Sequence, residues 1–108
     1  MNVNVQFRGE GDLLLGFIEG ELDTFTAPTL RDEFNSISIS QGLVIELDLS
    51  NVKFMDSTGL GVFVAFYKKV MKENAHLKLV NLSSRLTRLF EITGLSELMD
   101  IETADKGD

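Results

Sequence analysis

The chain has 108 residues, of which 44% are hydrophobic and 25% charged, and this matches the size and composition of one ordinary globular domain. It has no cysteine, which excludes disulfides and thiolate metal sites. The formal net charge is -7, and residues 1–56 hold ten acidic residues against three basic ones. Nucleic-acid binding needs a basic surface, so we expect no nucleic-acid partner, and a basic protein surface is the better complement.

The sequence predicts neither a signal peptide nor a membrane-spanning segment. The N-terminus MNVNVQFRGEGD has no basic stretch followed by an apolar one, as a signal peptide would have. Every apolar run is shorter than the roughly 18 residues of a membrane span. A domain without cysteine suits a reducing compartment, so we expect a cytoplasmic protein with no membrane partner.

The first third of the chain predicts a hairpin and a helix. Residues 3–7 alternate apolar and polar side chains as a strand does, and residues 13–19 read as its partner after the turn RGEGD. A helix should follow, capped by Thr26 or a neighbour and with Pro28 in its first turn. Its apolar positions are Ala27, Leu30, Phe34 and Ile37.

The remaining chain alternates strands and helices. Residues 43–49 (LVIELDL) are nearly continuously apolar, which predicts a central strand buried on both faces. Further predicted elements are a helix over about 58–74, a strand over 76–82, a helix capped by Ser83 and ended by Gly94, a helical turn over 96–100 and an edge strand over 101–103. We therefore expect a single α/β domain over residues 3–102, with a mixed four- to five-stranded sheet, helices mainly on one face, and a flexible tail over 103–108.

The stretch FMDSTGLGVF, residues 54–63, contains the side chains that most resemble a reactive site. A serine nucleophile at Ser57 would need a nearby base, and the one histidine, His76, follows the far end of a helix that is roughly 24 Å long at 1.5 Å per residue. The G-x-S-x-G elbow is absent, and DSTG has one residue too many for an aspartic protease. The sequence therefore predicts no enzyme and no catalytic residue.

Two glycines after Ser57 suggest a phosphate-binding loop. Gly59 and Gly61 follow a strand and open a helix, but G-x-G-x-x-G is incomplete and no lysine occupies the phosphate-loop position. The alternative is that both glycines let the helix start lie close against a neighbouring backbone. We expect no cofactor and no metal.

A third interpretation is that Ser57 is the substrate of another enzyme. Free N–H groups at a helix start would accept a phosphate, with a gain of at most ~2 kcal/mol. Asp56 would repel the added charge by about 3 kcal/mol per unit at ~5 Å and an effective dielectric constant of ~20. The site would thus tolerate phosphate poorly, and an acidic partner surface would not tolerate it, which is how a phosphorylation switch works.

The helix after Ser57 has apolar residues on more than one side. A helical wheel puts one stripe towards the core, and it leaves Val62 and Phe66 off that stripe as predicted partner contacts. The alternative is that another segment covers the first turns. The predicted core stripe consists of Leu60, Phe63, Val64, Tyr67, Val70 and Met71.

Three segments together resemble the bacterial anti-sigma factor antagonists of the STAS family: GELDTFTAPTLRDEF, LDLSNVKFMDSTGLGVFV and LKLVNLSSRLTRLFEITGL. The resemblance implies that Ser57 is phosphorylated by an anti-sigma factor that is a serine kinase. It also implies that the unmodified chain binds this kinase and frees a general stress sigma factor, and that a PP2C-type phosphatase restores the unmodified form.

The resemblance also implies which residues contact the partner. Asp56, Thr58 and Gly59 match the family motif around the phosphorylated serine, and Asp23 matches the acidic position of the GELD turn. The alternative within the same family is an adaptor domain of a transporter or sensor, without a phosphorylation switch. The intact DSTG motif favours the switch.

Overall fold

The computed structural model describes residues 2–104. Its elements, in chain order, are β1 (Val3–Glu10), β2 (Leu13–Leu22), α1 (Ala27–Asn35), β3 (Val44–Met55), α2 (Ser57–Lys72), β4 (His76–Leu82), α3 (Ser84–Ile92), the short 3-10 helix η1 (Leu95–Glu97) and β5 (Asp100–Thr103). This order confirms the predicted α/β domain, and each predicted strand and helix is present.

The five strands form one mixed sheet in the order β1-β2-β3-β4-β5. β1 and β2 are an antiparallel hairpin, whereas β2, β3, β4 and β5 run parallel, each joined to the next through a helix. Gly11 has a φ of 63° in the hairpin turn, a conformation that glycine adopts without strain. The mixed sheet with β3 at its centre was predicted correctly.

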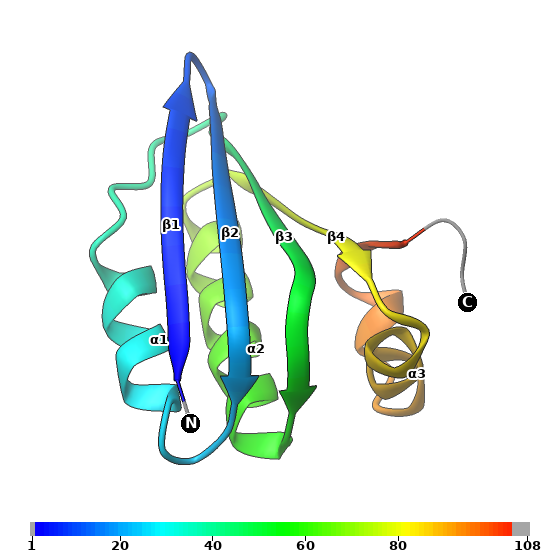
Figure 1. The fold of residues 1–108 in the computed structure, drawn as a ribbon. Helices are drawn as coiled ribbons and strands as arrows, with labels where there is room; N and C mark the ends of the chain where they lie inside the picture. Colours follow the sequence, from blue (N-terminus) through cyan, green and yellow to red (C-terminus); the bar gives the residue numbers. More distant parts are fainter. Residues whose placement is uncertain (1, 105–108) are drawn as a thin grey trace.

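The helices cover one face of the sheet and leave the other open. In Figure 1, α1 and α2 lie behind β1, β2 and β3, while α3 lies beside the end of β4. On the helix side of β3, Ile45, Leu47 and Leu49 are fully buried. On the open side, Glu46 and Asp48 are only half-buried. The central position of this strand was therefore predicted correctly, but its burial on both faces was wrong, because its two acids lie on the uncovered face.

Helix α2 packs against helix α1 as well as against the sheet. Phe66 is 3% exposed and its ring stacks on Phe34 of α1 with centroids 4.2 Å apart. Val62 is 5% exposed. Because α1 covers this side of α2, the prediction that Val62 and Phe66 face outward was wrong, and Met71 of the predicted core stripe is exposed instead.

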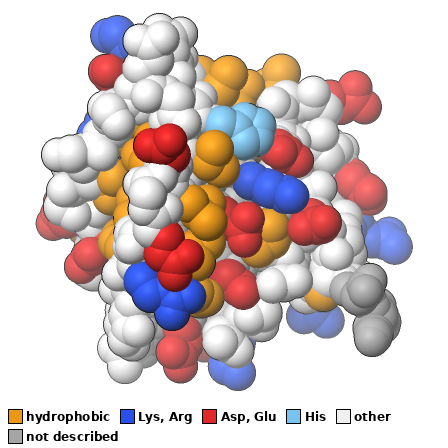
Figure 2. Space-filling model, turned by 90° about the horizontal axis from the view of Figure 1, so that it is seen from above, with side chains coloured by type: hydrophobic (Ala, Val, Ile, Leu, Met, Phe, Trp, Pro, Cys, Tyr) orange, Lys and Arg blue, Asp and Glu red, His pale blue; other side chains and the backbone are white. Residues whose placement is uncertain are grey.

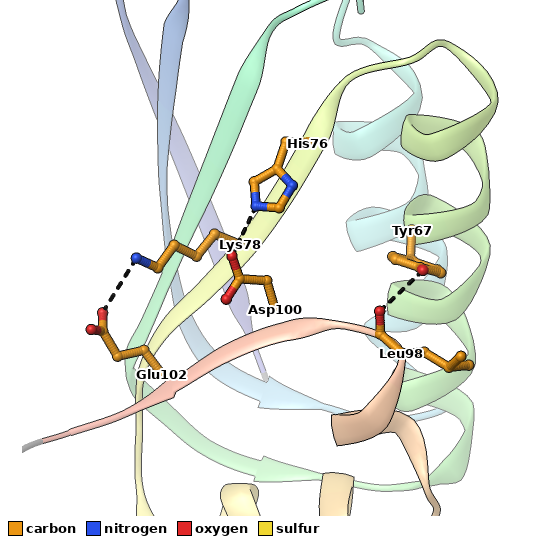
Figure 3. A network of polar contacts seen from close by, with 6 residues as sticks. All are labelled: Tyr67, His76, Lys78, Leu98, Asp100 and Glu102. Carbon is orange, nitrogen blue, oxygen red and sulfur yellow. Dashed lines mark hydrogen bonds and ion pairs between the residues drawn. The ribbon is translucent and has the colours of Figure 1, made fainter.

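Polar contacts hold the last strand to the rest of the sheet (Figure 3). His76 Nε2 lies 2.8 Å from Asp100 Oδ2, and Lys78 Nζ lies 3.8 Å from Glu102 Oε1. Ala104 N also donates to the Leu82 carbonyl at 2.9 Å. The tail was predicted to begin at residue 103, but β5 includes Thr103 and Ala104 is bonded to β4. The rest of the predicted tail, residues 105–108, lies outside the described residues.

Candidate functional site

The carboxyl ends of β2 and β3 meet at the lower end of the molecule in Figure 1, where α2 begins. Asp56 N donates to the Leu22 carbonyl at 3.0 Å, which joins the end of β3 to the end of β2. The Thr24 and Thr58 hydroxyl oxygens lie 3.4 Å apart, so the loop after β2 lies against the first turn of α2. We call the exposed residues of this end the Ser57 surface: Thr24, Phe25, Ser57, Thr58 and Gly61.

Asp56 caps helix α2. Its Oδ1 accepts hydrogen bonds from Thr58 N at 2.9 Å and from Gly59 N at 3.0 Å. These N–H groups are two of those that a helix start leaves without a partner, so the expectation of free N–H groups to receive a phosphate was wrong for both. A phosphate on Ser57 would have to displace the Asp56 carboxylate or point into solvent.

Ser57 is the first residue of α2 and is exposed. Its hydroxyl has no hydrogen-bond partner within residues 2–104. The side chain is therefore accessible to another enzyme, and the fold does not depend on it.

The two glycines of the motif have different roles. A Cβ atom on Gly59 would lie 2.7 Å from the Leu22 carbonyl oxygen, whereas a Cβ on Gly61 would meet nothing within 4 Å. Close backbone approach is confirmed for Gly59, which is buried and seats the helix start on β2. The same explanation was wrong for Gly61, whose missing side chain leaves the exposed surface of α2 flat beside Ser57.

Asp23 shapes the loop that carries Thr24 and Phe25. Its side chain is buried, and its Oδ1 accepts from Phe25 N at 2.9 Å and from Thr26 N at 3.1 Å. The Thr26 hydroxyl donates to the Glu21 carbonyl at 2.7 Å and does not cap α1. The carboxylate of Asp23 is thus committed within the loop, and any effect on a partner would come through the position of Phe25.

Phe25 is a candidate contact residue that the sequence analysis did not identify. Its side chain is 82% exposed, although the loop around it is held by the hydrogen bonds of Asp23. Exposed aromatic residues on ordered segments are frequent hot spots of protein interfaces. The sequence feature that could have indicated Phe25 is an aromatic residue between two threonines, just before the start of a helix.

Comparison with known proteins places this arrangement in a family. The sequence model described as "STAS domain" matches residues 4–106. This chain belongs to the STAS domain family. It is 45% identical over 108 residues to the protein of Bacillus subtilis named "Anti-sigma-B factor antagonist", with 99% of this chain and 97% of the relative covered.

Two further comparisons agree with the STAS assignment. The protein of the same name from Listeria monocytogenes is 40% identical over 106 residues, covering 97% of this chain and 93% of the relative. The crystal structure of an anti-sigma factor antagonist from Mycobacterium paratuberculosis superposes with a TM-score of 0.82 at 25% identity, covering 94% of this chain and 86% of that one. The five-stranded sheet and its helices are therefore those of the STAS fold.

The one histidine of the chain lies away from Ser57. His76 begins β4 at the opposite end of the molecule, which Figure 2 shows with the imidazole beside acidic and basic side chains. The prediction that His76 is too distant to serve as a base for Ser57 agrees with this position. Residues 2–104 contain no group of three or more His, Cys, Asp or Glu side chains arranged to hold a metal. No helix in this range is long and apolar enough to span a membrane.

Proposed function

We propose that this chain is an anti-sigma factor antagonist whose activity is switched by phosphorylation of Ser57. In its unmodified form it binds an anti-sigma factor that is also a serine kinase, and the bound kinase releases its sigma factor. The names of the Bacillus and Listeria relatives support the antagonist role and suggest a sigma-B type partner. The observation that carries the switch is the exposed Ser57 hydroxyl at the first position of α2, free of any role in the fold.

The chain acts in this scheme as a substrate and a binding module, without catalysis of its own. The Ser57 oxygen attacks the γ-phosphorus of ATP held by the kinase, ADP leaves, and the hydroxyl proton passes to a base. We assign that base to the kinase, since the carboxylate of Asp56 beside Ser57 is engaged in capping α2. A PP2C-type phosphatase reverses the modification.

Phosphate weakens binding because the Ser57 surface contains no cationic side chain to neutralise it. The capping bonds of Asp56 already use two N–H groups of the helix start. The new charge of about -1.5 to -2 therefore adds to the Asp56 carboxylate at the centre of the contact. Like charges at an interface cost binding energy, whereas the isolated chain exposes the same charge to water.

The proposed contact comprises the Ser57 surface together with the partly buried Asp56 carboxylate. Phe25 supplies an apolar anchor, and Gly61 and Thr58 present a flat face on which another backbone can lie closely. Gly59 and Asp23 act indirectly, by seating the helix and the loop. Val62 and Phe66 take no part in it, since α1 covers them.

Phosphate mapping tests this proposal. The chain is incubated with a sigma-B type anti-sigma kinase and ATP, and the modified residue is identified by mass spectrometry. Ser84 is a matched control, because it is also an exposed serine at the first position of a helix. We expect Ser57→Ala to abolish phosphorylation and Ser84→Ala to leave it unchanged. Incorporation into Ser57→Ala at the wild-type level would refute the assignment.

A further inference from the structure

A groove separates the end of β3 from helix α3. β3 pairs with β4 only as far as Asp48, yet continues along β2 to Met55. The two strands diverge beyond that point, as Figure 1 shows. The groove has a volume of about 310 Å³, and none of its lining residues belongs to the Ser57 surface.

The groove is lined mainly by apolar side chains from both walls. Phe54 of β3 is 50% exposed and Ile92 of α3 is 74% exposed, with Leu86 and Leu89 between them. Met55 completes the lining on the strand side. Contiguous exposed apolar surface of this kind marks an interaction site more often than an isolated exposed residue does.

The charge of the groove is opposite to that of the whole chain. Its charged lining residues are Lys53 on β3 and Arg85 and Arg88 on α3, and no acidic residue lines it. Within residues 2–104 none of these three cations forms a salt bridge. A cationic rim is thus available for an external anion in a protein whose net charge is -7.

The positions of the cations indicate how the anionic groups of a ligand are spaced. Arg85, Arg88 and Ile92 recur at helical spacing on one side of α3, and Lys53 stands on the opposite wall. Arg85 and Arg88 are ~4.5 Å apart along the helix axis at 1.5 Å per residue. A ligand with carboxylates along its length satisfies all three cations, whereas a fatty acid offers one carboxylate at one end.

We propose that this groove docks an acidic amphipathic segment of a partner protein, with apolar side chains towards Leu89 and Ile92 and carboxylates on Lys53, Arg85 and Arg88. Charge complementarity along both walls supports this occupant. The site is distinct from the Ser57 surface, because the two share no residue.

A synthetic peptide tests the groove directly. The probe is a fluorescein-labelled 14-residue peptide with leucines at helical spacing and glutamates elsewhere, and the control peptide carries glutamine in place of each glutamate. Fluorescence anisotropy should show saturable binding of the acidic peptide alone. Arg88→Glu should weaken it about tenfold, and Ile92→Ala about threefold. Arg8→Glu, an equal charge reversal on β1 outside the groove, should change it by less than about twofold.

Thermal unfolding of each variant checks that the fold is retained, which is expected because Arg88, Ile92 and Arg8 are exposed. The proposal is overturned if the acidic peptide does not saturate, or if the glutamine peptide binds equally well. Equal weakening by Arg88→Glu and Arg8→Glu would also overturn it, by showing only general charge attraction. Saturable binding of laurate in place of the peptide would assign the groove to a lipid-type ligand instead.

Discussion

Helix α2 has two sides with opposite roles. On one side Phe66 stacks on Phe34 and Val62 lies under α1, so these residues hold the helix in place. On the other side Ser57 and Gly61 are exposed and contact nothing that the fold requires. The contrast indicates that Val62 and Phe66 serve stability, while the part of the proposed binding surface that lies on α2 consists of small residues that packing does not constrain.

The largest expected effect is on the buried side. Phe66→Ala should lower the free energy of unfolding by about 3–5 kcal/mol, because it removes the ring stacked at 4.2 Å on Phe34 and leaves a cavity. Urea unfolding measures this change. Met71→Ala is the matched control, since Met71 is a large apolar residue on the exposed part of the same helix, and it should change stability by about 0.5 kcal/mol or less.

If Phe66→Ala unfolds like the wild type but loses kinase binding, the assignment of the two sides is reversed. Phe66 would then be a partner contact, as the helical wheel predicted.

Gly59 and Gly61 allow the buried and exposed sides of α2 to be compared within one motif. Gly59→Ala should destabilise the fold by about 1–3 kcal/mol, since the new Cβ would lie 2.7 Å from the Leu22 carbonyl oxygen. Gly61→Ala should stabilise it by up to about 1 kcal/mol, because alanine is the better helix former and the space is open. Thermal unfolding distinguishes the two signs, and a loss of stability in both variants would contradict the proposed difference.

Phe25 tests the exposed side. Phe25→Ala should weaken binding to the anti-sigma kinase about tenfold, or about 1.4 kcal/mol, with little change in melting temperature because the side chain is 82% exposed. Isothermal titration calorimetry measures the affinity. Unchanged affinity would remove Phe25 from the proposed contact but would leave the role of Ser57 open.

The fold was predictable where local signals agree with the tertiary structure. The alternation of residues 3–7, the capping Ser83 and the left-handed Gly94 each specify an element on their own, and all three were correct. The prediction that both faces of β3 are buried was wrong because it used the overall apolar content of LVIELDL. The alternation of its residues, with Glu46 and Asp48 on one face, shows which positions face solvent. The order of the strands and the face of the sheet that stays uncovered depend on how the elements pack together. The sequence of a single segment does not contain this information.

The candidate site was predictable only in part, for a similar reason. The wheel placed Val62 and Phe66 apart from the core stripe of α2, which was wrong, because it could not show that α1 covers both residues. Asp23 was expected to face a partner, yet its bonds to Phe25 N and Thr26 N occupy it within the loop. The exposure of Ser57 was predicted correctly from its place at a strand-to-helix turn, whereas its phosphorylation stays a prediction.

Calorimetric titration of the anti-sigma kinase with the unmodified and the Ser57-phosphorylated chain tests the central claim most directly. Ser57→Ala serves as a control that cannot be modified, and it should bind as tightly as the unmodified chain because the Ser57 hydroxyl makes no hydrogen bond within residues 2–104. Ser57→Asp should weaken binding partly, since a carboxylate carries less charge than a phosphate. We predict that phosphorylation weakens binding by at least about a hundredfold, or about 2.7 kcal/mol. Equal affinity of the phosphorylated and unmodified chains for the kinase would contradict the account.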